Sequence, residues 1–169
     1  MSKATKLWRS LLSMAGTAIL LVFAAGPALA EPDPTGAPVT TFTITLGDEK
    51  GASNDVITCE GRAYKPNYSG SAVVATGALT SCSRQPQTCR TETDLMRYYP
   101  GPGTFEVLAA GSVNYGCPPP SRSSTATFRH CQPSDVNWSY MSRTWVTISD
   151  GRSQKTGYAD SSLLNVRCA

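Results

Sequence analysis

Six cysteines restrict the folds available to this chain more than any other feature of its sequence. They stand at Cys59, Cys82, Cys89, Cys117, Cys131 and Cys168. An even number of cysteines in an exported chain predicts three disulfides, which brace small domains outside the reducing cytosol. A zinc site is the competing interpretation, but the sequence has no Cys-x-x-Cys pair and only one histidine, His130. We therefore expect disulfides and no metal.

The order of the cysteines favours one pairing, although the sequence alone does not choose among the many possible ones. Cys59 and Cys82 lie in two neighbouring predicted strands, so we expect a bridge across a hairpin. The other four cysteines would close the C-terminal part of the chain and tie it to the N-terminal part. The hypothesis is the set Cys59–Cys82, Cys89–Cys131 and Cys117–Cys168.

Residues 1–30 have the organisation of a secretory signal peptide. Basic residues at positions 3, 6 and 9 precede an apolar run over residues 11–23, and Ala28-Leu29-Ala30 supplies a small-x-small cleavage pattern. The apolar run is too short to span a bilayer. We therefore expect a secreted, extracellular product covering residues 31–169, with no membrane association after cleavage.

The charge balance argues against nucleic acid as a partner. The whole chain has 15 basic and 12 acidic residues, a net charge of +3. The three basic residues of the predicted signal peptide are lost on cleavage, so the remaining charges balance. No net positive field survives to attract a polyanion. No phosphate-binding glycine loop or calcium loop is present either, and we expect no cofactor.

The pattern of apolar residues is that of β-strands throughout. Residues 31–38 form a proline-rich extended arm, and residues 41–46 then alternate strictly between threonine and apolar side chains. No amphipathic run long enough for a helix follows. Further strands are expected at residues 55–64, 71–79, 90–99, 104–113, 125–131, 138–149, 157–159 and 163–168. Residues 92–97 could instead form one or two helical turns, but the alternation over residues 90–99 favours a strand.

These strands predict an all-β fold, a disulfide-braced antiparallel β-sandwich or barrel. Residues 65–70 are expected to break the second strand. Residues 39–112 and 113–169 would form two small β units or combine in one domain. Asp150-Gly151 is typical of a two-residue type I′ turn and predicts a hairpin after residue 149.

Several short motifs resemble those of the small, uncharacterised, disulfide-rich proteins that actinobacteria secrete. They are Val56-Ile57-Thr58-Cys59, Val74-Ala75-Thr76-Gly77, Leu95-Met96-Arg97 and Val166-Arg167-Cys168. The resemblance extends over nearly all of residues 31–169. It implies an exported β-sandwich-like protein and implies no activity.

The C-terminal part also resembles the last half of a bacterial SH3-like domain. The similarity lies in residues 145–152, which read Trp-Val-Thr-Ile-Ser-Asp-Gly-Arg, and in residues 156–163. Tyr158 stands where that family usually has tryptophan, and extra residues separate Arg152 from Gly157. Members of the family often bind cell-wall peptides or glycan, so the resemblance implies a partner at the cell envelope.

Catalysis is not expected from this sequence. A Ser/His/Asp or Cys/His arrangement would require His130, and no Gly-x-Ser-x-Gly motif accompanies it. Carboxylates that could act in pairs on a glycosidic bond are scattered singly, at Glu60, Glu92, Glu106, Asp135 and Asp160. We therefore expect a binding protein, with enzymatic hydrolysis as the minor alternative.

Three aromatic residues, Trp138, Tyr140 and Tyr158, are the candidate ligand-binding residues. Exposed aromatic rings on a rigid sheet stack on sugar rings or on peptides. The expected partner is cell-wall glycan or peptide, or an extracellular protein. The competing interpretation is that these rings fill the core, where Trp145 is expected to lie.

A secreted protease inhibitor is the alternative function. Arg84 lies between Cys82 and Cys89, and Arg122 follows Cys117, so both are expected on loops held close to disulfides. A rigid loop loses little entropy when it docks into a protease. Both arginines could equally belong to ordinary surface loops.

Overall fold

The computed structural model describes residues 39–47, 56–131, 133 and 135–168. The predicted signal peptide and the arm over residues 31–38 lie outside them. None of the described residues belongs to a helix that could cross a membrane. The described strands are β1 (Val39–Leu46), β2 (Ile57–Tyr68), β3 (Val73–Cys82), β4 (Thr88–Tyr99), β5 (Thr104–Ala110), β6 (Asn114–Tyr115), β7 (Arg122–Phe128), β8 (Trp138–Ser149), β9 (Gln154–Asp160) and β10 (Leu164–Val166).

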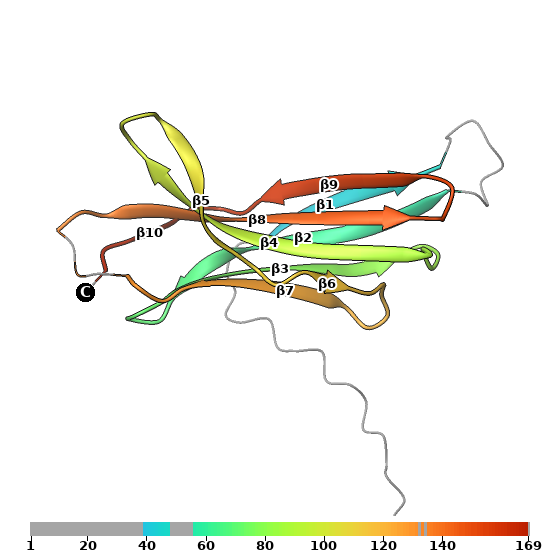
Figure 1. The fold of residues 1–169 in the computed structure, drawn as a ribbon, viewed down its shortest axis with the longest axis horizontal. Coiled ribbons are helices and arrows are strands. Elements are labelled where there is room, and N and C mark those ends of the chain that lie inside the picture. Colours follow the sequence, from blue (N-terminus) through green and yellow to red (C-terminus); the bar gives the residue numbers. More distant parts are fainter. Residues whose placement is uncertain (1–38, 48–55, 132, 134, 169) are drawn as a thin grey trace, which may run out of the picture. The chain divides into compact units, whose positions relative to one another are not determined.

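The strands form two antiparallel sheets, so the predicted all-β, disulfide-braced sandwich is confirmed (Figure 1). The first sheet has the order β1-β2-β3-β7. In the second, β10, β8, β4 and β5 are neighbours in that order, with β9 also paired to β8 and β6 to β4. Each sheet combines strands from residues 39–112 with strands from residues 113–169, through the pairs β3–β7 and β4–β8.

Two apolar clusters fill the space between the sheets. At one end, Ile44 and Leu79 of the first sheet pack with Val146 and Ile148 of the second. The second cluster surrounds Tyr140 and includes residues of β3, β4 and β7. Because alternate residues of each strand point inward, both sheets contribute to each cluster, and this shared burial holds them together.

A polar layer separates these clusters. Thr93 and Thr144 are fully buried there, with their hydroxyl oxygens 3.4 Å apart. The Thr93 amide donates to Ser124 Oγ at 3.0 Å, so the layer links β4 to β7 of the other sheet. The sheets approach closely at this level, because a Cβ atom added to Gly77 would lie 1.8 Å from Thr144 Oγ1. Only glycine fits at that position without moving its neighbours.

The disulfides confirm one predicted pair and correct the other two. Cys59 and Cys82 stand opposite each other on β2 and β3 and are bonded. The predicted Cys89–Cys131 and Cys117–Cys168 bridges are wrong, since the other bonds are Cys89–Cys117 and Cys131–Cys168. The cause is the short strand β6, which pairs with β4 and brings Cys117, two residues after its end, beside Cys89. Three such bonds are consistent with an oxidising environment.

Two local predictions also need correction. Strand β2 does not end at residue 64 but continues to Tyr68, with a register shift between Tyr64 and Asn67 that accommodates Pro66. The turn after β8 is not a two-residue type I′ turn, because Ser149 pairs with Gln154 and four residues lie between them.

The carboxylate of Asp150 organises this longer turn. It accepts hydrogen bonds from the backbone N–H groups of Ser153, at 2.8 Å, and Arg152, at 2.9 Å. Those bonds lower the pKa of Asp150. Gly151 has a φ of 87°, which glycine adopts without strain.

Candidate functional site: a groove on the outer face of the second sheet

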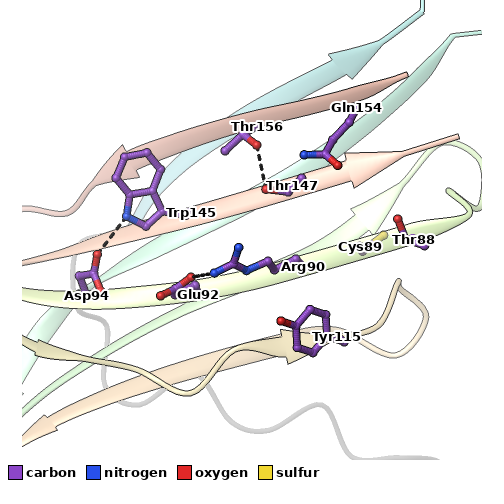
Figure 2. Close-up of a pocket in the computed structure, with 10 residues that line it drawn as sticks. All are labelled: Thr88, Cys89, Arg90, Glu92, Asp94, Tyr115, Trp145, Thr147, Gln154 and Thr156. Atoms are coloured by element: carbon purple, nitrogen blue, oxygen red, sulfur yellow. Dashed lines mark hydrogen bonds and ion pairs between the residues drawn. The ribbon is translucent and has the colours of Figure 1, made fainter. Parts of the chain in front are cut away.

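The outer face of the second sheet carries a groove built from alternate residues of neighbouring strands. The register places Glu92 opposite Trp145, and Trp145 opposite Tyr158. The residues next to Glu92 and Trp145 along their strands are buried, so these side chains share the face turned away from the core. The groove has a volume of about 630 Å³ and is lined by Thr88, Cys89, Arg90, Glu92, Asp94, Tyr115, Trp145, Thr147, Gln154 and Thr156 (Figure 2).

A fixed aromatic pair, Trp145 and Tyr158, lies on this face. Their ring centroids are 4.7 Å apart, and the planes are tilted by 43°. Trp145 Nε1 donates a hydrogen bond of 3.1 Å to Asp94 Oδ2 (Figure 2). Tyr158 remains 52% exposed. Asp94 therefore holds the edge of the indole and Tyr158 packs beside it. These contacts fix the position of the ring, as a surface for stacking requires.

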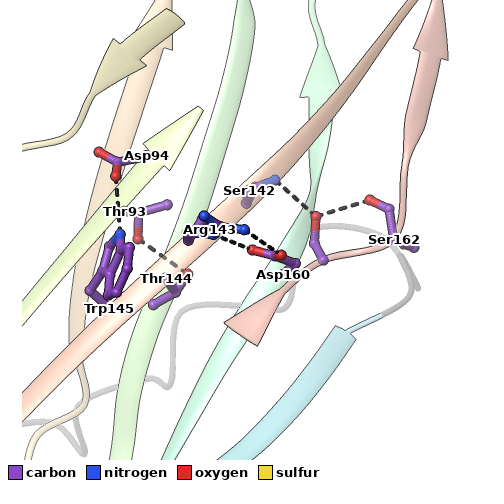
Figure 3. Close-up of polar contacts among 9 residues, drawn as sticks. Thr93, Asp94, Ser142, Arg143, Thr144, Trp145, Asp160 and Ser162 are labelled. Atoms are coloured by element: carbon purple, nitrogen blue, oxygen red, sulfur yellow. Dashed lines mark hydrogen bonds and ion pairs between the residues drawn. The ribbon is translucent and has the colours of Figure 1, made fainter. Parts of the chain in front are cut away.

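Two ion pairs flank the aromatic pair. Arg143 donates two hydrogen bonds to Asp160, of 2.6 and 2.8 Å, and these raise the pKa of Arg143 (Figure 3). The Arg143 guanidinium also lies 4.9 Å from the ring centroid of Tyr158. On β4, Arg90 forms an ion pair with Glu92. The positive charges of Arg143 and Arg90 are thus each balanced by a neighbouring carboxylate.

Asp94 differs from the other acidic residues of the face. Among the described residues, no basic side chain forms an ion pair with it, and Trp145 is its hydrogen-bond partner. Burial raises its pKa, the Trp145 hydrogen bond lowers it, and the nearby Glu92 raises it further. Arg143, opposite Asp94 on β8, lowers this pKa by less than burial raises it, so the carboxylate carries a desolvation cost that the protein's own charges offset only in part.

Uncharged polar groups complete the lining. The hydroxyl oxygens of Thr147 and Thr156 lie 2.8 Å apart on β8 and β9, and Gln154 follows on β9. On the opposite side Tyr115 is 76% exposed. Hydroxyl and amide groups both donate and accept hydrogen bonds, so this part of the groove suits a ligand rich in hydroxyls.

The three predicted aromatic residues are not brought together. Tyr140 is only 1% exposed and belongs to the core cluster, where its hydroxyl lies 3.9 Å from the sulfurs of Cys131 and Cys168. Burial raises its pKa. Trp138 lies at the same end of the sandwich, stacked on Arg97. Of the three, only Tyr158 is on the groove face.

Trp145 is not the core residue that we predict from the sequence. The alternation along β8 is as expected, with Val146 and Ile148 on the face opposite to Trp145. It is Val146 and Ile148 that are fully buried, so Trp145 lies on the outer face, opposite Glu92 of β4. The predicted alternation of β8 is therefore correct, but the prediction that Trp145 faces the core is wrong.

The two arginines of the alternative function occupy different settings. Arg84 is exposed in the segment 83–87 between β3 and β4. Arg122 is not in a loop: it begins β7, pairs with Leu79, and its Nε donates to the Cys117 carbonyl at 3.3 Å.

His130 is exposed, with its ring centroid 6.5 Å from that of Phe128. Nowhere in the described ranges do three metal-binding side chains come together.

Sequence reasoning missed Arg90, Asp94 and Tyr115 of the groove lining and the neighbouring Arg143, and it named Glu92 only as one of several scattered carboxylates. One signal was present: residues 88–94 alternate between polar outward positions and smaller buried ones. That pattern identifies a polar face but not its neighbours. Trp145 and Asp94 are 51 residues apart in the chain and meet only through the β4–β8 pairing.

Comparison with known proteins adds no relative, because no protein-family model, curated protein or solved structure matches this chain. The fold and the groove define its class: a disulfide-braced β-sandwich with a preformed polar and aromatic groove on one sheet face.

Proposed function

We propose that this protein is a secreted, non-enzymatic binding protein that holds a saccharide chain of the cell envelope in the groove. The observation that carries the proposal is the fixed pair of Trp145 and Tyr158 on an open sheet face. A sugar ring has an apolar face that stacks on such rings and hydroxyls that pair with threonine, glutamine and carboxylate groups. The groove provides both kinds of contact side by side.

The arrangement of charges favours binding over hydrolysis. Glycosidases use two carboxyl groups that face the scissile bond, one of them able to give up a proton. In the groove Glu92 is engaged by Arg90, and beside it on the same face Asp160 accepts two hydrogen bonds from Arg143. Asp94 is left as a single carboxylate, bonded to the indole that forms the stacking surface.

Export is part of the proposal. Residues 1–30 resemble a signal peptide, and the three disulfides agree with oxidising surroundings. A protein released in this way meets the glycan strands of the cell wall as it leaves the cell.

The experiment is co-sedimentation of the purified, oxidised protein with cell-wall sacculi. Trp145→Ala and Tyr158→Ala are expected to weaken sedimentation at least tenfold, because each removes one ring of the stacking pair. Tyr98→Ala is the matched control: Tyr98 pairs with Phe105 at 5.2 Å on the same sheet and belongs neither to the groove lining nor to the Trp145–Tyr158 pair. Wild-type protein that stays in the supernatant, or equal losses in all three variants, would reject the proposal.

A protease inhibitor remains the second candidate, carried by the segment 83–87 alone. Arg84 is exposed there, and Cys82 and Cys89 at either side of the segment are both bridged. Inhibition of a trypsin-like protease that disappears in Arg84→Ala would support it. Arg122→Ala serves as the control, since that side chain is held against the Cys117 carbonyl within β7.

A further inference from the structure

We infer that the groove selects a saccharide that carries a protonated amine, and that Asp94 is the residue that binds the amine. The inference rests on the proposed function, because it concerns the ligand of the same groove. Its basis is the position of Asp94 on the groove lining next to Trp145 (Figure 2).

The charges on the groove face leave one negative charge in excess. Arg90 is paired with Glu92, and Arg143 with Asp160, so these four charges cancel in pairs. Asp94 forms no ion pair among the described residues, because Arg143, which lies opposite it on β8, is engaged by Asp160. A groove of this charge attracts a cation and repels anionic polymers such as uronic acids or phosphate-linked chains.

The hydrogen bonding of Asp94 leaves it able to accept a further donor. One oxygen, Oδ2, accepts the indole N–H of Trp145 at 3.1 Å, and Oδ1 has no donor among the described residues. A half-buried carboxylate without an ion pair is costly, and an ammonium group from the ligand offsets that cost. The raised pKa of Asp94 reflects the same desolvation.

The indole determines which amine fits. A sugar ring that stacks on Trp145 places its ring substituents at the edge of the indole, where Asp94 is bonded. An amine attached directly to the ring can therefore reach the carboxylate while the ring keeps its stacking contact. We commit to an amino sugar with a free amine, as in deacetylated glucosamine chains, and treat the amines of wall peptides as an outcome of the test.

Two glucosamine oligosaccharides of equal length, one fully deacetylated and one fully acetylated, test the inference by calorimetry. Wild-type protein is expected to bind the deacetylated form on the order of tenfold more tightly, as a charge-assisted hydrogen bond exceeds a neutral one. Asp94→Asn should remove this preference and retain binding of the acetylated form. Glu106→Gln is the control: it removes one negative charge from β5 of the same sheet, outside the groove lining.

Each outcome bears on one hypothesis or the other. Sacculus binding that requires Trp145, with no preference for the deacetylated chain, keeps the proposed function and rejects the inference. A preference that persists in Asp94→Asn also rejects it. If sacculi bind but neither oligosaccharide does, and a lysine-containing wall peptide competes in an Asp94-dependent way, the amine comes from the peptide and the amino-sugar assignment is wrong.

Ionic strength provides a second measurement that needs no variant. Raising salt from about 0.1 M to about 1 M shortens the screening length to roughly 3 Å. Binding of the deacetylated chain should then fall toward that of the acetylated chain, whose affinity should change little. Equal sensitivity of both chains to salt would contradict a contact between Asp94 and an ammonium group.

Discussion

Two regions of the second sheet combine arginine with aromatic rings, and only one of them leaves the rings available. On the groove face, Arg143 is held by Asp160. At the other end of the sandwich, the Arg97 guanidinium lies 4.5 Å from the ring centroids of both Tyr99 and Trp138 and donates to the Tyr99 hydroxyl. Arg97 has no carboxylate partner among the described residues.

The difference shows what opens an aromatic surface to a ligand. Arg97 stacks on the rings and occupies the position that a sugar would take, a cation–π arrangement that stabilises the fold. Arg143 lies farther from its rings, 5.8 Å from the centroid of Trp145 and 4.9 Å from that of Tyr158, and it donates to Asp160. Asp94 holds the indole by its edge. Carboxylates therefore decide which of the two sets of rings stays uncovered, although the sequence presents aromatic residues in both regions.

The largest expected effect is a loss of stability at the end of the sandwich that holds Arg97, Trp138 and the buried Tyr140. Tyr140→Ala should lower the free energy of unfolding by about 3–5 kcal/mol, because it removes a large, fully buried side chain. Tyr158→Ala is the matched change on the groove face and should cost less than about 1 kcal/mol, since half of the ring is exposed. Denaturant titration of the oxidised proteins measures both values. Similar losses of stability in the two variants would contradict the contrast between the buried ring and the ring on the groove face.

The second prediction concerns Trp138, which packs against Arg97. Trp138→Ala should lower the free energy of unfolding by about 1–3 kcal/mol, since it removes a partly buried ring and one cation–π contact. It should leave sacculus binding within about twofold of wild type. Co-sedimentation beside Trp145→Ala provides the measurement. A loss of binding as large as that of Trp145→Ala would indicate that the ligand binds near Trp138 and not in the groove.

The third prediction makes the groove face resemble the region around Arg97, where the guanidinium covers the rings. Asp160→Asn removes the charged acceptor of Arg143, so the guanidinium, which now lies 4.9 Å from the ring centroid of Tyr158 and 5.8 Å from that of Trp145, is free to settle more closely over these rings, as Arg97 lies over Trp138. Binding to sacculi should weaken by about two- to fivefold, the size of an exposed cation–π contact. Glu60→Gln, which breaks the exposed Glu60–Arg62 ion pair on the other sheet, is the control and should bind as wild type.

The smallest effect is a pH dependence that comes from Asp94. Burial raises its pKa, so the carboxylate becomes protonated, on acidification, at a higher pH than an exposed aspartate, whose usual pKa is about 3.9. The groups that face it are Glu92 on β4 and Arg143 and Trp145 on β8, while Ala110 of β5 lies opposite. Binding of the deacetylated oligosaccharide should therefore fade as pH decreases through this raised pKa, because the amine stays protonated throughout.

The stability of the protein should respond to Asp94 in the opposite sense. A carboxyl group with a raised folded-state pKa contributes most below its unfolded pKa, and the contribution is lost as pH rises through the folded pKa. Asp94→Asn should therefore melt at the wild-type temperature or above it at neutral pH. A fall in the neutral-pH melting temperature would contradict this sign.

The strand pattern could be read from the sequence with few errors. Strand β8 has the predicted limits, and the alternation around Thr147 and Ile148 is the one observed. The Cys59–Cys82 bridge was predictable for the same reason, because a hairpin pairs residues that are close in the chain. Local spacing contains the information for such features, since a strand and its turn involve neighbouring residues.

What the sequence determined by itself is thus an all-β chain, braced by disulfides, with strands at largely correct positions. The tertiary structure alone decided the faces and the long-range partners. β6 had to lie on β4 before Cys117 could reach Cys89, and β4 had to pair with β8 before Asp94 could hold Trp145. Alternation specifies two faces for a strand but leaves open which one is buried, because that depends on the sheet that packs against it.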